Sequence, residues 1–438
     1  MPFESNSAPA RRIAVIGAGI SGMAAAHLLA PAHSVVLYEA GAQLGGHAVT
    51  VVAGKRGDQP VDMGFIVFNK VNYPRLTALF AALDVPIAPS NMSFACSIQG
   101  GALEYGLHNL NTLFAQRRNL VNPRYLRMLA DILRFHRNAD RVLTPGMTLR
   151  DLLTTMRMSD AFRDHYISPF TGAIWSTPSA GMLDFPAQAL IRFFKNHGLM
   201  GVSKNHQWFT VQGGSVEYVR RLGADLVRHG VHLRLSTPIA GVRRTANGAL
   251  VRAVGGEWEF YDEVVFATHS DDTLRLLADP TPVETAALSA IRYQANQAIL
   301  HADPAQMPKS RRIWASWNYA EPAGPRPDRI DLTYWMNSLQ PIPKDDPLFV
   351  TLNPTRPIDD RLIHQVRTFH HPVYDLAALR AQSDIRAFNG GSATWFCGAW
   401  TRHGFHEDGL VSGLGVAAAL GARAPWAAGE DALRIAAE

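Results

Sequence analysis

The chain has 438 residues, of which 47% are hydrophobic and 18% charged, and its formal net charge is +5. This length predicts two or three lobes rather than one small core, and this composition excludes a disordered chain. The modest positive charge excludes a nucleic-acid-binding arm and favours anionic surfaces.

Cysteine content and apolar runs indicate the cellular compartment in which the protein is expected. Cys96 and Cys397 have no metal-ligand spacing and form no disulfide framework, so a reducing compartment is expected. No run reaches the ~18 apolar residues needed to span a bilayer, and the N-terminal segment lacks the apolar stretch of a secretory signal. We therefore expect a cytoplasmic protein, soluble or peripheral at the inner face of the membrane.

The first predicted unit is a strand, a glycine-rich turn, a helix and a second strand. The apolar runs Ile13–Ile16 and Val35–Tyr38 are the strands, and an Ala/Leu-rich helix lies between them. In a GxGxxG turn the glycines allow a tight bend, approach of the backbone to a pyrophosphate, and close helix contact. The pyrophosphate charge then lies at the helix N-terminus. The residues of this turn are Gly17, Gly19, Ile20, Ser21 and Gly22.

An acid and a second glycine turn indicate which dinucleotide is bound. Glu39 ends the second strand, where its carboxylate can accept both ribose hydroxyls of an adenosine and repels a 2′-phosphate. Gly45, Gly46 and His47 follow it. A Gly-Gly turn at this place is typical of FAD enzymes of the glutathione-reductase and amine-oxidase types and is missing from NAD dehydrogenases. We predict FAD as the cofactor, bound non-covalently because no Cys or His stands in a recognised attachment motif.

Smaller elements follow. Residues 59–65 predict a strand that enters Gly64, where the backbone must lie close to something flat. Pro74–Leu83 predicts a short helix with proline in its first turn. Met92–Tyr105 predicts a hairpin that turns at residues 99–101.

Residues 107–141 form a basic segment with a helical pattern, interrupted at Asn122-Pro123. It holds seven arginines and two aspartates, interleaved with large apolar residues. One interpretation is an amphipathic surface that lies on an anionic membrane. The other is a helix that packs on the body of the protein and turns a solvated basic face outward.

The rest of the chain returns to the first fold and adds a second sheet. Further elements of the first fold are strands near 208–212, 231–235, 239–242, 263–268 and 394–397, and the amphipathic helix Val216–Arg228. Residues 291–371 predict a separate antiparallel sheet that includes Arg312–Trp317, Leu332–Met336 and Leu348–Leu352.

This order predicts an α/β nucleotide fold assembled from separated pieces. We assign residues 9–85, 205–285 and 385–425 to a discontinuous Rossmann-like FAD-binding domain. Residues 86–204 and 286–384 form an inserted α+β substrate lobe with an antiparallel sheet and helices.

Several stretches, in order, resemble the flavin amine-oxidase superfamily. They resemble more closely the NAD(P)/FAD-binding proteins that form the N-terminal half of plant cyclopropane fatty acid synthases, whose bacterial relatives stand alone, often beside cyclopropane-type methyltransferases. The matching stretches are RIAVIGAGISG, LGGHAVT, VDMGFIVFNKVNYP, NMSFACSI, GAIWSTP, FVTLNP, WFCGAW and GFHEDGL.

The resemblance implies roles for further residues. Gly45 to His47 and Met63, Gly64 and Phe65 would line the ribityl chain and the isoalloxazine. Ile239 would hold adenine through its backbone. Gly398 and the turn Asp408, Gly409 and Leu410 would bring a helix N-terminus to the flavin pyrimidine ring, where its dipole favours negative charge.

The chain departs from the superfamily near the flavin. Ala399 replaces an acid, Arg402-His403 replaces a Gly-Tyr pair, and no convincing lysine is found for the position near flavin N5. Amine chemistry is therefore disfavoured, although Phe405 stands at a position like that of the aromatic cage. His406 and Glu407 are the candidate acid–base groups, with loop orientation or helix capping as the alternative.

Two classes of function compete. The first is an FAD-dependent oxidoreductase that desaturates or isomerises an unsaturated or methyl-branched acyl group of a phospholipid, at an anionic membrane surface and with a cyclopropane-type methyltransferase as a partner. The second is a non-catalytic FAD-binding partner of such a methyltransferase. A carotenoid-desaturase-like or amine oxidase activity is weaker, because the sequence shows no acidic cage for a cation.

Overall fold

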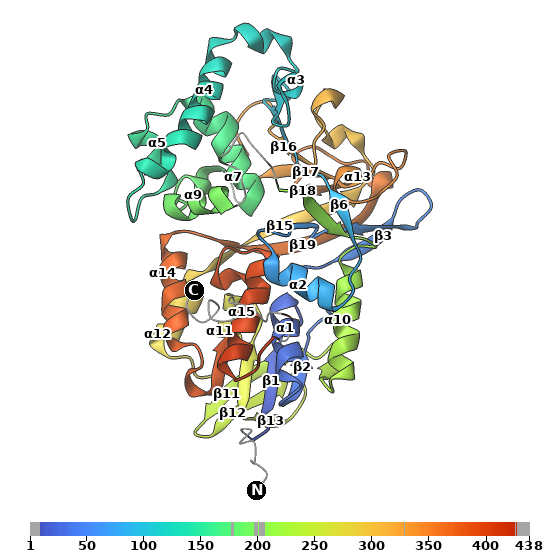
Figure 1. The fold of residues 1–438 in the computed structure, drawn as a ribbon, viewed down its shortest axis with the longest axis vertical. Helices are drawn as coiled ribbons and strands as arrows, with labels where there is room; N and C mark the ends of the chain where they lie inside the picture. Colours follow the sequence, from blue (N-terminus) through green and yellow to red (C-terminus); the bar gives the residue numbers. More distant parts are fainter. Residues whose placement is uncertain are drawn as a thin grey trace.

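The computed structural model describes residues 9–176, 179–196, 200, 206–327, 329–424 and 426. A nucleotide-binding sheet with its helices forms one end of the molecule, and a lobe of mixed sheet and helices forms the other (Figure 1). The sequence indicates no secretory signal at the N-terminus. Most of that segment, residues 1–8, lies outside the described residues.

Five parallel strands form the central sheet of the nucleotide-binding part. Their spatial order is β10 (His232–Arg234), β2 (Ser34–Tyr38), β1 (Arg12–Ile16), β14 (Glu263–Phe266) and β20 (Thr394–Phe396). They come from three separated stretches of the chain, which confirms the predicted discontinuous fold. Because both faces of the sheet are covered, its strands are continuous apolar runs rather than alternating ones.

Different layers cover the two faces of this sheet. Three helices pack on one face: α1 (Ile20–Leu29), α10 (Val216–Arg228) and α15 (His406–Ala419). The other face meets an antiparallel sheet of β11 (Ile239–Thr245), β12 (Gly248–Ala253) and β13 (Trp258–Tyr261).

Helices α1 and α15 approach each other through glycine. A Cβ on Gly413 would lie 2.3 Å from the carbonyl oxygen of Ser21, and a Cβ on Gly409 would lie 2.9 Å from Cγ2 of Ile20. Only glycine fits at these contacts. The N-termini of both helices are therefore held side by side, although they lie far apart in the sequence.

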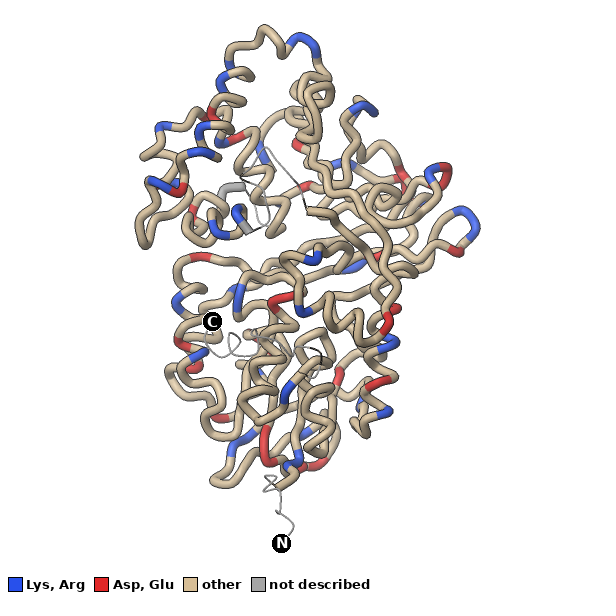
Figure 2. Tube along the Cα trace, in the orientation of Figure 1, with Lys and Arg blue, Asp and Glu red and all other residues tan. Residues whose placement is uncertain are grey.

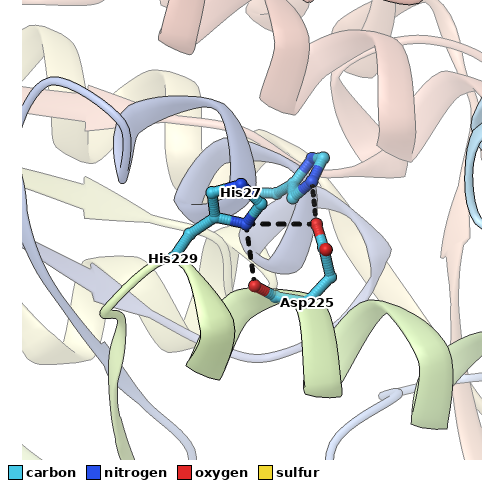
Figure 3. Close-up of side chains that lie close together, drawn as sticks. All are labelled: His27, Asp225 and His229. Carbon is cyan, nitrogen blue, oxygen red and sulfur yellow. Dashed lines mark hydrogen bonds and ion pairs between the residues drawn. The ribbon is translucent and has the colours of Figure 1, made fainter.

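A polar cluster fixes α10 against α1 (Figure 3). The Asp225 carboxylate lies 2.5 Å from Nε2 of His27 and 3.3 Å from Nδ1 of His229, and it also pairs with Arg228. Burial lowers the pKa of His27 to about 4, so its neutral ring donates Nε2–H to the carboxylate. The cluster is structural, since Arg228 balances the charge of Asp225.

A seven-stranded sheet forms the floor of the second lobe. Its spatial order is β19 (Ile363–Val373), β15 (Arg292–His301), β18 (Phe349–Leu352), β17 (Asp331–Trp335), β16 (Trp317–Ala320), β7 (Phe94–Ile98) and β8 (Leu103–Gly106). The predicted hairpin is confirmed as β7 and β8, with positive φ at residues 99–101. The strand predicted at Arg312–Trp317 is wrong, because Arg311–Ile313 forms a 3₁₀ turn and only Trp317 joins the ladder. Ile313 and Ala315 are buried against Ala95 of β7.

Smaller elements join the two parts. β3 (Thr50–Ala53) pairs with β4 (Gln59–Asp62), and β9 (Trp208–Val211) pairs with both β5 (Val67–Asn69) and β6 (Ile87–Ser90). Helix α2 (Pro74–Ala82) begins at its proline, as predicted.

Short helices complete the second lobe around an aromatic core (Figure 1). They are α3 (Leu110–Leu113), α4 (Pro123–Asn138), α5 (Leu149–Thr155), α6 (Asp160–Phe162), α7 (Ser168–Trp175), α8 (Ser179–Met182) and α9 (Ala187–Asn196). The predicted break in the basic segment is confirmed, since the Asn122 side chain caps α4 by accepting the N–H groups of Arg124 and Tyr125. In the described part of the chain, no helix is both long enough and apolar enough to cross a membrane.

Two helices move the predicted domain boundaries. α12 (Pro282–Ala290) and α14 (Leu376–Phe388) pack against each other and share a core with the nucleotide-binding sheet through small apolar residues such as Ala287, Ala378 and Ala381. The segment 286–384, assigned to the substrate lobe, is therefore too long at both ends.

Candidate active site

A cavity of about 1620 Å³ runs between the two parts of the molecule. Single small-molecule sites are usually about 300–1,000 Å³. The cavity therefore has room for a dinucleotide and a second ligand. One end is lined by the glycine-rich turn and the ends of the parallel strands, and the other by apolar side chains of the second lobe.

The dinucleotide end is open in front of α1. Gly19 caps this helix without any side-chain hydrogen bond, and a Cβ placed on it would meet no atom within 4 Å. Gly17, with φ +102°, makes the tight bend, and Gly22 lets the turn close, since its Cβ would lie 1.9 Å from the Gly17 carbonyl oxygen. The free N–H groups and the helix dipole suit a pyrophosphate here.

Glu39 holds the glycine-rich turn through hydrogen bonds. Its two carboxylate oxygens accept the N–H groups of Ala18 and Gly41, each at 2.8 Å. Each oxygen keeps a lone pair for a ribose hydroxyl. Glu39 and Ile239 both line the cavity, as the predicted adenosine site requires.

The predicted flavin residues meet further along the cavity. Gly45, Gly46, His47, Met63, Gly64, Phe65 and Gly398 all line it, with Ile20 and Ser21. A Cβ on Gly64 would lie 1.9 Å from the His47 carbonyl oxygen, so these two segments touch. Gly45 and Gly398 have φ of +120° and +156°, which side-chain-bearing residues rarely adopt.

Three half-buried imidazoles and a phenyl ring form a cluster in the cavity wall that the sequence did not reveal. The His47 ring lies 5.6 Å from His269, 5.8 Å from His371 and 5.4 Å from Phe369. Burial lowers the pKa of His47 and His269 to about 4 and that of His371 to about 3. Near neutral pH these three imidazoles are therefore uncharged.

His406 lines the cavity, but Glu407 does not. The His406 ring stacks on Phe65 at 4.0 Å, its Nε2 lies 2.6 Å from the Tyr218 hydroxyl, and burial lowers its pKa to about 3. The Glu407 carboxylate instead accepts the N–H groups of Arg75 and Leu76 at 2.8 and 2.9 Å and so caps α2. We therefore keep His406 as a candidate and assign Glu407 the capping role.

The remaining predicted site residues lie outside the cavity wall, in a helix cap and in helix contacts. Asp408 accepts the N–H of Phe405 at 3.0 Å and caps α15. Gly409 and Leu410 are buried in the contact between α15 and α1. Asp408, Gly409, Leu410 and Gly22 do not line the cavity.

Glu407 predicts a pH dependence of stability. Burial raises its pKa from 4.5 to about 7, although its two N–H donors oppose the shift. Unfolding restores the ordinary pKa, so the folded state holds the Glu407 proton more tightly than the unfolded state does. The free energy of unfolding that this difference adds is complete below pH 4.5 and is lost as the pH rises through 7. The difference is at most roughly 3 kcal/mol. Between about pH 5 and about pH 8, the Tm of Glu407→Gln should fall less than that of the wild type. Parallel declines would contradict this assignment.

The far end of the cavity is apolar. Its side chains come mainly from α3, α4, α7, α9 and the loop before α15: Leu113, Phe114, Leu129, Ile132, Phe170, Ile174, Trp175, Phe193 and Phe405. Phe405 stacks on Phe193 at 4.9 Å. We call this end the apolar arm. Among the described residues that line the whole cavity there is no lysine, and the carboxylates are Glu39 and Asp272, both on the nucleotide-binding part.

The profile of the family described as flavin containing amine oxidoreductase matches residues 20–314. Solved structures with a similar fold include cyclohexylamine oxidase from Brevibacterium oxydans IH-35A, with 16% sequence identity and a TM-score of 0.68 over 94% of this chain and 99% of that chain. A CLA-producing fatty acid isomerase from P. acnes has 15% identity and a TM-score of 0.64 over 92% of this chain and 97% of that chain. Reduced UDP-galactopyranose mutase has 14% identity and a TM-score of 0.68 over 97% of this chain and 98% of that chain. No curated protein sequence matches this chain.

Proposed function

The chain belongs to the flavin containing amine oxidoreductases and is an FAD-dependent oxidoreductase, and from this premise we propose that it oxidises an acyl chain of a membrane phospholipid. The bond oxidised would be a carbon–carbon bond of an unsaturated or methyl-branched chain. Two hydrogens leave the chain, and the product carries one more double bond.

The observation that carries this proposal is the apolar arm. Among the described residues of α3, α4, α7 and α9 that line it there is no lysine, arginine, aspartate or glutamate, and its wall consists mainly of leucine, isoleucine and aromatic rings, with His136 of α4 among them. A cationic amine would need a carboxylate or a comparable polar partner at this depth, because a buried unpaired charge is costly. A hydrocarbon chain needs none.

The resemblance to relatives that stand beside cyclopropane-type methyltransferases supports a chain that has already been methylated. The fatty acid isomerase of similar fold supports the same substrate class. It also supports double-bond isomerisation as a second candidate reaction.

The protein residues would bind and orient the chain, while FAD, when bound, supplies the acceptor for the departing hydride. His406 is the acid–base group of this proposal, and its support is that it lines the cavity, stacks on Phe65 and hydrogen-bonds with Tyr218. The second proton would leave either to the neutral ring of His406 or to water.

His406→Ala should lower turnover by about 100-fold while leaving the FAD content near that of the wild type. Because burial keeps the pKa of His406 at about 3, the wild-type turnover should show no ionisation near pH 6.5. His229→Ala, which changes a histidine outside the cavity, is the matched control. Unchanged turnover in His406→Ala would remove this residue from the reaction.

The cellular test is the phospholipid acyl profile of cells with and without the protein. We expect cells that lack it to accumulate methylated acyl chains two hydrogens heavier than those of cells that have it. Identical profiles, with methylated chains present in both, would contradict the proposed function. Loss of methylation itself would favour a non-catalytic partner of the methyltransferase.

A further inference from the structure

The cavity reaches the surface within the basic segment. Leu110 on α3 is 74% exposed and Leu133 on α4 is 44% exposed, yet both line the cavity. Between them the chain passes through a short 3₁₀ turn, Arg117–Val121. We call the stretch from α3 through α4 the arch. It lies at the end of the molecule farthest from the nucleotide-binding sheet (Figure 1).

The arch also carries exposed apolar side chains that do not line the cavity. Leu120, Val121 and Leu126 are 51%, 83% and 41% exposed. Leu126 shares a face of α4 with Leu129 and Leu133, at positions i, i+3 and i+7, and the last two line the cavity. An apolar stripe therefore runs from the outer surface into the apolar arm. Single exposed apolar residues are ordinary, but a gathered set at a cavity mouth indicates a contact surface.

The basic segment also carries arginines whose charge no described acidic side chain balances. Arg127 and Arg134 pair with Asp131. Within the described residues, no ion pair neutralises the others, which are Arg117, Arg118, Arg124, Arg137 and Arg141. All five are exposed. Figure 2 shows blue positions repeated along the arch with little red between them.

We propose that the arch docks on an anionic lipid bilayer and admits the acyl chain of an intact phospholipid through its mouth. The arginines meet the lipid phosphates, the exposed leucines and Val121 enter the acyl boundary, and the chain slides along the stripe into the apolar arm. This inference rests on the proposed function and names the form in which its substrate arrives.

A bilayer fits these observations better than a soluble carrier of one acyl chain. A carrier presents its anionic group at one point, whereas the unbalanced arginines are spread over the whole arch. Leu120 and Val121 are exposed beside them and line no part of the cavity. A lipid bilayer would bury these two side chains, whereas a carrier of one acyl chain would leave them exposed.

Vesicle binding by the FAD-loaded full chain tests the docking. Wild-type protein should bind phosphatidylcholine vesicles that contain phosphatidylglycerol, bind pure phosphatidylcholine much more weakly, and dissociate as salt rises. Each arginine contributes about fivefold in affinity, so R117E/R118E/R124E should weaken binding by about 100-fold or more. The matched control, R56E/R220E/R361E, changes the net charge equally at exposed arginines outside the arch and should bind nearly as the wild type does.

The outcomes separate docking from chemistry. Equal loss in the arch variant and the control, or equal binding to neutral vesicles, would overturn the docking surface. FAD content checks that each variant is folded.

If methylated phospholipid in detergent micelles reduces the flavin but the arch variant still binds vesicles normally, the docking is wrong and the proposed function stands. If vesicle binding follows the arch but micellar lipid never reduces the flavin, the proposed function is wrong and the docking stands. Faster flavin reduction by an acyl chain on a carrier protein than by vesicle lipid would overturn the bilayer as the source.

Discussion

Gly19→Val protein should purify colourless and should not regain FAD on incubation with the cofactor. The backbone at Gly19 has ordinary dihedral angles, with φ −72°, and a Cβ there meets no protein atom within 4 Å. The fold therefore tolerates a side chain at this position. The space that the side chain fills is that of the pyrophosphate, so the apparent Kd for FAD should rise at least about 100-fold, or about 2.7 kcal/mol.

Gly415→Val is the matched control for this experiment. Gly415 lies in α15, lines no part of the cavity, and would also meet nothing within 4 Å. This variant should be yellow and should release FAD on denaturation. Gly22→Val is not a substitute, because its Cβ would collide with the Gly17 carbonyl oxygen and would disturb the fold itself. Yellow Gly19→Val protein with wild-type FAD content would contradict the assignment of the dinucleotide end.

Ile132→Trp should abolish turnover on phospholipid and should leave FAD binding intact. Ile132 is on α4 and lines the apolar arm, so a larger ring at this position takes up the volume that the acyl chain needs. A displacement of the reacting carbon by even about 1 Å costs about 100-fold in rate.

Ala130→Trp adds the same ring on the exposed side of the same helix and serves as the control. We expect its micellar activity to be close to that of the wild type. Normal turnover in Ile132→Trp, measured in detergent micelles, would show that the acyl chain does not occupy the arm.

Local sequence signals predicted the nucleotide-binding part well. The turn Gly17–Gly22, Glu39 and the pair Gly45-Gly46 are close in sequence, and each has a backbone or charge requirement that few residue types meet. The helices and strands around them follow from apolar runs bounded by glycine and proline.

The site itself could be predicted only in part, because its walls come from distant segments. His269 follows a buried strand, the usual place for ligand-binding residues in such sheets, but nothing local brings it to His371 on β19. Glu407 looked like an acid–base group because it adjoins His406. Its partners, however, are the N–H groups of α2, more than 300 residues earlier in the chain, at Arg75 and Leu76.

The basic segment shows the same limit. Its arginines and leucines predicted an amphipathic helical surface, and its break at Asn122-Pro123 was correct. That five of its leucines line a cavity shared with the predicted flavin residues follows only from the tertiary fold.

The most direct test of the proposed function is anaerobic mixing of the oxidised holoprotein with extracted methylated phospholipid. We expect the flavin absorbance to bleach and an acyl product two hydrogens lighter to appear in equal amount. If an isomer forms without net bleaching, the lipid substrate stands and the reaction is isomerisation rather than oxidation. If spermine or another amine bleaches the flavin faster than the phospholipid does, the phospholipid assignment is wrong.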